Sequence, residues 1–303
     1  MEFLYLLEKI RMPGLNELML MVTTLGEETA FLVIGLIVFW CVDKRKGYYV
    51  MSVGFLGTMV NQIMKITFRI PRPWVRDPKF TILEEARAAA GGYSFPSGHT
   101  QSAVGTLGSV AVFAGKKWLR TACIVLAVLV AFSRMYVGVH TPADVLVASV
   151  CAVVLVLALK KPVLQGGHKE MKIVFAGMIA VSLAFLAYVH FWNFPADIDT
   201  GNLTSAFRNA YTMLGCTTGM AIVYLVDTKW LNFSVEAKPW EQFGKIVFGL
   251  LAVLAVKEGL RAPLELLLPV YPARAVRYFL VVITAGILWP MTFPYFRKIG
   301  EKA

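Results

Sequence analysis

Hydrophobic residues along the chain gather into long runs that are separated by short polar segments. A helix needs about 20 mostly apolar residues to cross the roughly 30 Å of hydrocarbon in a membrane. Runs of this kind predict nine spans, at residues 19–42, 48–67, 99–115, 119–137, 142–160, 171–191, 206–226, 243–260 and 275–296. We therefore predict an all-α fold, a polytopic integral-membrane helical bundle with about nine transmembrane helices.

The pattern contains no internal repeat, low-complexity tract or linker. It predicts a single integral-membrane domain over residues 1–303, with a core at about 19–160 and additional C-terminal helices at about 171–296. Residues 1–14 carry four charges and no small-residue cleavage site. We expect an interfacial amphipathic helix there rather than a signal peptide.

The composition supports this class of protein, with 57% hydrophobic and only 16% charged residues and a mean hydropathy of +0.64. A soluble domain has about 45–50% apolar and about 25% charged residues, so disorder is excluded and a soluble globule is disfavoured. The formal net charge of +11 suits contact with anionic lipids and an anionic substrate. We therefore expect membrane lipids as partners and no nucleic acid. The four cysteines lie in or beside apolar runs without a Cys-x-x-Cys pair, which indicates small hydrophobic residues.

The distribution of lysine and arginine predicts the orientation. Alternate loops carry 16 of these cations, in a series that ends with Arg297, Lys298 and Lys302, and the opposite side carries 14. Six of those 14 lie in one loop, residues 65–98. When these six are attributed to a binding site, the positive-inside rule places the first side in the cytoplasm. The amino terminus is then expected outside and the carboxyl terminus inside.

Three short segments concentrate polar residues at the predicted ends of spans: Lys65–Pro73, Ser94–His99 and Ser133–Asp144. The predicted topology brings all three to the same, non-cytoplasmic face of the membrane. Charges at membrane depth are costly and are usually retained for function. The agreement of the three segments therefore predicts one site at that face.

The third segment has the chemistry of a helix start. Pro142 suits the first helical position and Thr141 the preceding cap, so His140 is expected just ahead of a helix. Asp144 then lies in the first turn, where its carboxylate would accept a hydrogen bond from one imidazole nitrogen. The other nitrogen of His140 would be free to act as a nucleophile.

The other two segments supply an anion site. Ser97 is expected to cap the third span, and Gly98 lets the backbone approach a ligand closely. Free amides at that helix start would combine with the cations Lys65, Arg72 and Arg134. This set matches a phosphoryl group, whose charge is spread over its oxygens and which arginine grips with two donors.

The spacings Lys-x6-Arg-Pro (65–73), Pro-Ser-Gly-His (96–99) and Ser-Arg-x5-His-x3-Asp (133–144) resemble the three signature motifs of the type 2 phosphatidic acid phosphatase superfamily. This superfamily includes lipid phosphate phosphatases, glucose-6-phosphatase and vanadium haloperoxidases. The resemblance covers residues 65–144, under a third of the chain. It implies the superfamily's helical phosphatase core and a metal-independent phosphohydrolase that needs no cofactor.

The resemblance also implies a role for each matching residue. His140 would attack phosphorus and form a phosphohistidine, Asp144 would orient it, and His99 would protonate the leaving group. The residues expected to hold the phosphoryl oxygens are Lys65, Arg72, Ser97, Gly98 and Arg134. A metal site built from the two histidines and the aspartate is the alternative, which the three nearby cations disfavour. The remaining histidines, His168 and His190, are expected in loops without a catalytic role.

The long segment after residue 160 resembles the layout of the glucose-6-phosphatase and sphingosine-phosphate phosphatase members. We predict hydrolysis of a lipid phosphate monoester, such as a phosphatidate or a sphingoid-base phosphate, at the non-cytoplasmic face. A sugar phosphate and a polyprenyl pyrophosphate are alternative substrates. A non-enzymatic lipid or anion transporter is the alternative from a different class. Residues 81–90 are expected to form a short helix that ends at Gly91 and Gly92, either as a lid or as a plain connection.

Overall fold

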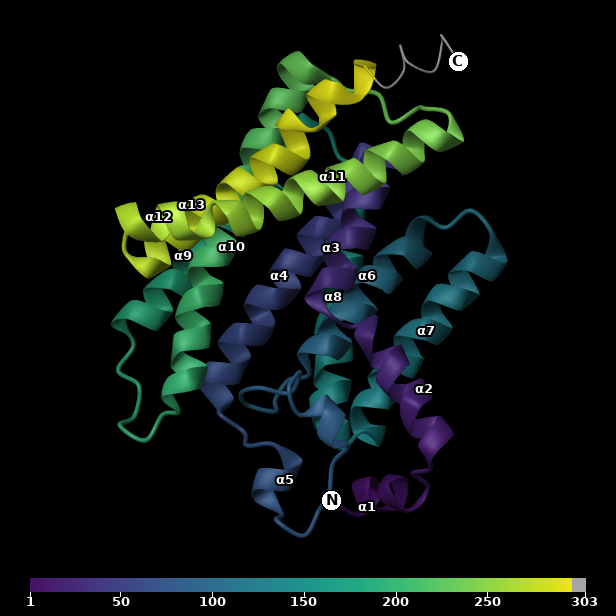
Figure 1. Cartoon of the computed structure of the whole chain (residues 1–303), viewed down its shortest axis with the longest axis vertical. Coiled ribbons are helices and arrows are strands. Elements are labelled where there is room, and N and C mark those ends of the chain that lie inside the picture. Colours follow the sequence, from purple (N-terminus) through teal and green to yellow (C-terminus); the bar gives the residue numbers. More distant parts are fainter. Residues whose placement is uncertain (296–303) are drawn as a thin grey trace. The chain divides into compact units, whose positions relative to one another are not determined.

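A computed structural model describes residues 1–295, which form helices and connecting segments without a strand (Figure 1). In the first half of the chain these are α1 Glu2–Lys9, α2 Pro13–Thr24, α3 Glu28–Ile37, α4 Lys44–Phe68, α5 Pro73–Arg76, α6 Gly98–Phe113, α7 Lys117–Tyr136 and α8 Pro142–Leu164. In the second half they are α9 His168–Phe191, α10 Thr200–Val226, α11 Pro239–Gly259, α12 Arg261–Leu267 and α13 Val270–Ile283. The all-α prediction is confirmed for this part of the chain.

All nine predicted spans coincide with helical segments, but fewer pass a test for membrane crossing. Four helices are long and apolar enough: α7, α8, α9 and the helical stretch Val270–Tyr295. A fifth is added if α2 and the segment Glu28–Val42 form one bent span. The number of nine crossings therefore stays a prediction. The predicted ninth span reaches residue 296, and the cations Arg297, Lys298 and Lys302 follow it, outside the described residues.

The predicted first span, residues 19–42, is not a straight helix. Its two parts, Pro13–Thr24 and Glu28–Val42, meet at a bend of 54°. A Cβ atom on Gly26 would lie 2.8 Å from the His99 carbonyl oxygen and 2.9 Å from Val130 Cγ1. The bend therefore brings backbone against backbone at a point where a side chain has no room.

The described chain forms two compact units. The first consists of Met1–Leu32, Ser52–Lys160 and Pro195–Ala206. The second consists of Val33–Met51, Lys161–Phe194 and the described chain from Phe207 onward. The single domain over residues 1–303 stays a prediction. All three polar segments identified in the sequence lie in the first unit.

The core of the first unit forms around α7, against which α1, α2 and α6 pack. One buried cluster joins α2, the segment after α5 and the end of α7 through Met19, Ala86, Ala90, Tyr136, Val137 and Val139. A second joins α1 to the same segment through Leu4, Leu7, Phe80 and Ile82. Helix α1 thus forms as predicted, yet two of its apolar side chains are buried in protein. Phe3, Leu6 and Ile10 stay exposed.

The segment between α5 and α6 is less helical than predicted. Residues 81–90 contain one 3₁₀ turn, Glu84–Ala86, instead of a helix. The Arg87 amide donates to Glu84 O, and the Ala90 amide donates to Arg87 O, so successive tight turns replace the α-helical pattern. Because Ala86 and Ala90 are buried in the cluster with α2 and α7, packing decides this conformation against the helix preference of alanine.

In the second unit, the prediction that His168 and His190 lie in loops is wrong. His168 is the first residue of α9 and His190 lies in its last turn. Each ring contacts a tyrosine hydroxyl of α10, His168 Nδ1 with Tyr224 at 2.7 Å and His190 Nε2 with Tyr211 at 3.1 Å. These tyrosine partners explain how two polar rings are accommodated at the ends of an apolar helix.

Candidate active site

The turn that carries His140 is fixed by its own backbone. After α7, Gly138 adopts φ +88°, a conformation that glycine allows without strain. The amides of Val139 and His140 both donate to Arg134 O, at 3.1 and 3.2 Å. A Cβ on Gly138 would lie 2.8 Å from Arg11 Nη2. The chain therefore reverses tightly and presents His140 directly ahead of α8.

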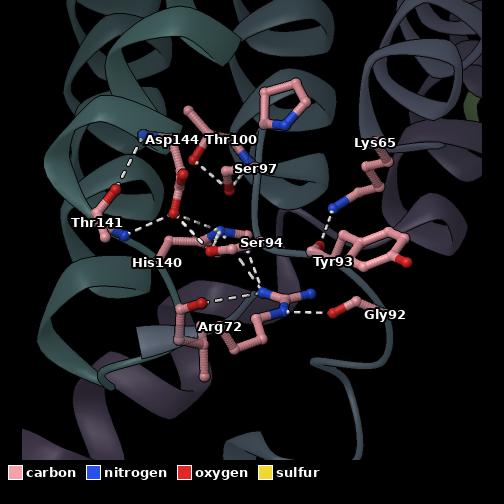
Figure 2. Close-up of polar contacts among 12 residues, drawn as sticks. Lys65, Arg72, Gly92, Tyr93, Ser94, Ser97, Thr100, His140, Thr141 and Asp144 are labelled. Carbon is pink, nitrogen blue, oxygen red and sulfur yellow. Dashed lines mark hydrogen bonds and ion pairs between the residues drawn. The ribbon is translucent and has the colours of Figure 1, made fainter. Parts of the chain in front are cut away.

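The predicted cap of α8 is confirmed. Pro142 is the first residue of the helix. The Thr141 amide donates to Asp144 Oδ2 at 2.7 Å, and the Asp144 amide donates to Thr141 Oγ1 at 3.3 Å (Figure 2). This reciprocal pair holds the carboxylate of Asp144 at the helix start, beside the residue that precedes the cap.

The guanidinium group of Arg72 fixes the protonation of His140. Arg72 Nη1 lies 2.9 Å from His140 Nε2 (Figure 2). The same Nη1 atom lies 3.5 Å from His140 Nδ1. Because a guanidinium group only donates, the shorter contact assigns Nε2 as the accepting nitrogen and leaves the proton on Nδ1. Nδ1 lies 3.5 Å from Asp144 Oδ2. The imidazole thus has its lone pair on the side of the cations and its proton on the side of the carboxylate.

The electrostatic setting keeps His140 neutral. The residue is 1% exposed. Burial, followed by the positive charges of Arg72, Arg134 and Lys65, holds the pKa of His140 well below its ordinary value of about 6.5. A neutral imidazole is the form in which histidine acts as a nucleophile.

Ser94 is a site residue to which sequence reasoning assigned no role. Its Oγ donates to Asp144 Oδ2 at 2.6 Å and lies 3.5 Å from His140 Nδ1. The side chain is fully buried, and its amide donates to Ile70 O at 2.7 Å. Its position at the start of the second polar segment was the only signal in the sequence.

The second segment is joined directly to the third. Ser97 caps α6 as predicted, since its Oγ accepts from the Thr100 amide at 3.3 Å. The Ser97 amide donates to the backbone oxygen of Asp144 at 3.1 Å. Gly98 follows as the first residue of α6. The amides at the start of α6 therefore lie beside the start of α8.

The first segment reaches the site through Arg72 and Lys65. Besides its contact with His140, Arg72 donates at 2.9 Å to each of three backbone oxygens, those of Gly91, Gly92 and Val139. Lys65, from the last turn of α4, donates to Tyr93 O at 2.6 Å (Figure 2). These contacts fasten residues 91–93, directly before the second segment, between the end of α4 and the turn before α8.

Asn202 supports the same segment from far along the chain. The Tyr93 amide donates to Asn202 Oδ1 at 2.9 Å, across 109 positions of sequence. Asn202 belongs to the first turn of α10 and, like Tyr93, to the first unit. Sequence reasoning gave no indication of this residue, because nothing local marks a partner so distant.

Arg134 is the most deeply buried of the predicted cations, with no exposed surface. Its Nη1 donates to Thr23 Oγ1 at 2.5 Å. Its Nε and Nη2 are buried and have no hydrogen-bond partner among the described residues. Leaving buried donors of a charged group unpaired is costly, so these two donors suit an anionic ligand.

His99 lines a cavity of about 310 Å³. The other polar residues lining it are Glu27, Glu28, Thr58, Asn61, Gln62, Gln101 and Ser102. The Nε2 atom of His99 is buried and has no hydrogen-bond partner within residues 1–295. It is therefore available to a group that enters the cavity. Unlike His140, His99 makes no side-chain hydrogen bond to another predicted site residue in the described chain.

The predicted residues thus converge on one end of the first unit. Arg72, His140, Asp144 and Ser97 form a continuous chain of contacts. Arg134 joins this chain because its backbone oxygen accepts from the His140 amide. Lys65 bonds Tyr93 O, next to Gly92, whose backbone oxygen accepts from Arg72. Gly98 and His99 follow Ser97 in α6. Among residues 1–295, no three His, Cys, Asp or Glu side chains are grouped so that they could hold a metal ion.

These features define a helical protein with a cationic site built around a buried histidine. Residues 45–166 match the PAP2 superfamily, and residues 211–301 match the transmembrane extension of the PAP2 superfamily phosphatases. The chain is 31% identical over 152 residues to phosphatidylglycerophosphatase B of Bacillus subtilis, which covers 45% of this chain and 70% of that protein. The chain therefore belongs to the PAP2 superfamily and is an integral membrane protein.

For two further relatives, the matched region covers a smaller share of the relative's own length. The undecaprenyl-diphosphatase BcrC of Bacillus subtilis is 29% identical over 113 residues, 37% of this chain and 55% of the relative. A probable sphingosine-1-phosphate phosphatase of Dictyostelium discoideum is 32% identical over 151 residues, 46% of this chain and 36% of the relative. The chain thus spans about half the length of the first of these two. No solved structure matches the chain.

Proposed function

We propose that the protein is a membrane phosphatase that hydrolyses a phosphate monoester of a lipid through a phosphohistidine intermediate. The observation that carries the proposal is the contact of 2.9 Å between Arg72 Nη1 and His140 Nε2. It places an unprotonated imidazole nitrogen next to a cation suited to phosphoryl oxygens. Membership of the PAP2 superfamily supports the same chemistry.

In the first step, Arg72 transfers its hydrogen bond from His140 Nε2 to a phosphoryl oxygen, and the freed lone pair of Nε2 attacks phosphorus as the ester P–O bond breaks. The electron pair leaves with the ester oxygen, which takes a proton from His99 to give an alcohol. Asp144 stabilises the positive charge that develops on the imidazole. Arg72, Arg134, Lys65 and the amides at Ser97 and Gly98 hold the phosphoryl oxygens, because phosphoryl transfer depends mainly on positioning and charge stabilisation.

In the second step, water attacks the phosphorus of the phosphohistidine. His99, now neutral, takes a proton from the water. The N–P bond breaks, its electron pair returns to His140 Nε2, and inorganic phosphate is released. Two moderate barriers replace one high barrier, which is the advantage of a covalent intermediate.

A lipid substrate is supported by the membrane-embedded fold and by the relatives. Their names specify undecaprenyl diphosphate, phosphatidylglycerophosphate and sphingosine 1-phosphate as substrates of those proteins. For this chain we propose a phosphatidate-like or sphingoid-base phosphate. A polyprenyl diphosphate is the second candidate, favoured by the undecaprenyl-diphosphatase BcrC among the relatives. Measuring phosphate release from each of these lipids and from a sugar phosphate ranks the candidate substrates. Repeating the assay with a chelator tests whether the reaction needs a metal ion.

Replacement of the nucleophile tests the mechanism. We expect His140→Ala to abolish turnover and the acid-labile labelling of the protein by substrate that carries ³²P in the phosphate. The matched control is His190→Ala, which removes a histidine that contacts Tyr211 in the second unit and should leave both intact. Turnover by His140→Ala at the rate of the unaltered protein would refute the proposal and favour a binding or transport role.

Replacement of the general acid tests the role of His99. An aryl phosphate has a leaving group that departs without a proton, so His99→Ala should still release one equivalent of phenol in a burst. An alkyl lipid phosphate should give no burst with the same variant, because its alkoxide needs the proton. Equal losses with both substrates would contradict the assignment of His99.

We also propose that the site opens at the non-cytoplasmic face. Once the six cations of residues 65–98 are set aside, 16 lysines and arginines lie on the predicted cytoplasmic side and 8 on the opposite side. In a background without native cysteines, Asp197→Cys reports on the outer side and Gln165→Cys on the cytoplasmic side. A membrane-impermeant maleimide added to intact cells should label only the first. Labelling of the second alone would reverse the proposed orientation.

A further inference from the structure

A second cationic pocket lies in the C-terminal unit. It has a volume of about 280 Å³ and is formed by residues at one end of α10, α11, α12 and α13. Its charged lining residues are Arg208, Lys257, Glu258, Arg261, Glu265, Arg274 and Arg277. All of them belong to the second unit, whereas the candidate active site belongs to the first.

The pocket carries an excess of positive charge. Glu258 contacts Lys257 at 3.3 Å, and Glu265 contacts Arg261 at 3.6 Å, so each acidic side chain is paired locally. Three arginines remain without an ion pair among the described residues: Arg208, Arg274 and Arg277. Three guanidinium groups around one pocket match a phosphate-sized anion, which accepts several hydrogen bonds at once.

Arg277 provides the observation that points to a ligand. Only 7% of the residue is exposed, and its Nε has no hydrogen-bond partner within residues 1–295. The guanidinium carbon lies 5.4 Å from the centre of the Tyr278 ring, which does not satisfy the Nε–H donor. Because a buried, unpaired donor on a cation is costly, an anion in the pocket would supply the missing acceptor.

Arg274 is held at the wall of the same pocket. Its Nε donates to Thr212 Oγ1 at 2.7 Å, which links α13 to α10. The guanidinium carbon also lies 5.2 Å from the Tyr278 ring. Two arginines one turn apart on α13 are therefore positioned before any ligand binds, and preorganisation of this kind lowers the cost of binding.

The surroundings of the pocket resemble the boundary of a membrane. Tyr271 stacks on Phe207 and Tyr211, with ring centres 5.3 and 5.7 Å apart. Aromatic residues of this kind gather at headgroup depth. Leu266 and Leu267, next to the pocket residue Glu265, are 86% and 80% exposed. Exposed leucines beside a cationic pocket offer a surface for acyl chains.

From these observations we infer that the pocket between α10, α11, α12 and α13 binds the phosphate group of an anionic ligand, with a phospholipid favoured by the exposed leucines. Arg274 and Arg277 bind the phosphate oxygens, and Arg208 adds charge at the rim. The acyl chains lie against Leu266 and Leu267. This site is separate from phosphoester hydrolysis and does not depend on the proposed function.

Lipid binding to the purified full chain tests the inference. Phosphatidylglycerol and phosphatidylcholine are titrated in detergent and bound lipid is counted by native mass spectrometry. Arg274→Gln/Arg277→Gln should weaken phosphatidylglycerol binding at least tenfold and leave phosphatidylcholine binding unchanged. The matched control is Lys169→Gln/Lys172→Gln, which removes two exposed cations elsewhere in the second unit. The active site is identical in all variants, so a difference reports on the pocket.

A second variant covers the case in which loss of Arg277 prevents folding. Arg208 is exposed, so Arg208→Gln should fold normally and weaken phosphatidylglycerol binding about threefold. A parallel titration with soluble glycerol 3-phosphate distinguishes the source of the phosphate group. Tighter binding of the lipid assigns the site to phospholipid, and tighter binding of the soluble ester assigns it to a free phosphate compound. Unchanged binding of both ligands in folded arginine variants would overturn the inference.

Discussion

The Oγ atom of Ser94 donates a hydrogen bond of 2.6 Å to Oδ2 of Asp144. The same oxygen accepts from the Thr141 amide at 2.7 Å and faces His140 Nδ1 at 3.5 Å. Two strong donors therefore hold the carboxylate in place behind the imidazole. Because both Ser94 and Asp144 are buried, water cannot replace the serine hydroxyl without rearrangement.

Ser94→Ala should therefore slow catalysis without abolishing it. Removal of one hydrogen bond to a buried carboxylate costs about 1.5–3 kcal/mol, so we expect kcat to fall about tenfold or more while KM changes little. Ser149→Ala is the control, because the Ser149 hydroxyl donates to Val145 O within its own helix. An unchanged kcat for Ser94→Ala would show that Asp144 does not need this donor.

Gly26→Ala should damage the site from outside the three motifs. The new Cβ would lie 2.8 Å from the His99 carbonyl oxygen and 2.9 Å from its Cβ, both rigid parts of α6. Overpacking of this kind costs about 1–3 kcal/mol, and we expect a lower unfolding temperature together with reduced kcat. Gly14→Ala, at an open position of α2, should be neutral or slightly stabilising.

Arg134→Lys should weaken the binding of phosphate mimics. Lysine keeps the charge but lacks the buried Nε and Nη2 donors of the arginine. We expect the inhibition constant of vanadate to rise at least tenfold. Arg120→Lys, at an exposed position of the same helix, should leave that constant unchanged. An unchanged inhibition constant for vanadate in Arg134→Lys would show that Arg134 does not bind the phosphate group.

The acid limb of the pH profile should lie below the ordinary range of histidine. The titratable groups around His140 are Asp144, Arg72, Arg134, Lys65 and His99. Burial, followed by the charges of the three cations and His99, lowers the pKa of His140. Because the neutral imidazole is the reactive form, kcat/KM should stay high as pH falls through about 6.5 and should decline only in more acidic solution. Measuring the pH profile with two substrates whose phosphate groups have different pKa values distinguishes titration of the enzyme from titration of the substrate. An acid limb at pH 6.5 with both substrates would contradict a lowered pKa of His140.

Glu27→Gln should reveal which leaving group enters the cavity beside His99. Glu27 and Glu28 line this cavity, so a lipid phosphate with an ammonium group near the ester should interact favourably with them. We expect Glu27→Gln to raise KM for a sphingoid-base phosphate about tenfold, equivalent to roughly 1.4 kcal/mol, and to leave phosphatidate unaffected. Glu17→Gln, at an exposed position of α2, is the control. Equal effects on both lipids would exclude a charge-selective role.

The local parts of the site could be predicted from the sequence. Thr141, Pro142 and Ser97 are helix-start residues whose side chains act within three positions, so residue type and spacing are sufficient. The apolar runs likewise located the long helices α4, α6, α7 and α8 around the site, but not the short helix α5 that follows Arg72. The short helix expected over residues 81–90 was wrong because burial of its alanines outweighed their helix preference.

The distant parts of the site could not be predicted. Asn202 accepts a hydrogen bond from Tyr93 across 109 positions of sequence. Gly26 lies against His99 at a bend for which the glycine itself was the only sequence signal. Such contacts depend on how helices pack, which hydrophobic periodicity does not encode. The same holds for His168 and His190, which were expected in loops but belong to α9. Their tyrosine partners lie on the neighbouring helix α10.

Helix α1 holds the segment between the first and second motifs. Tyr5 donates to Asp77 at 2.9 Å, Glu8 accepts from Thr81, and Leu4 and Leu7 pack on the same stretch. An affinity tag or fluorescent reporter fused directly ahead of this helix would therefore sit beside the contacts that hold residues 77–82 in place. A flexible spacer at that junction keeps the added domain away from these contacts.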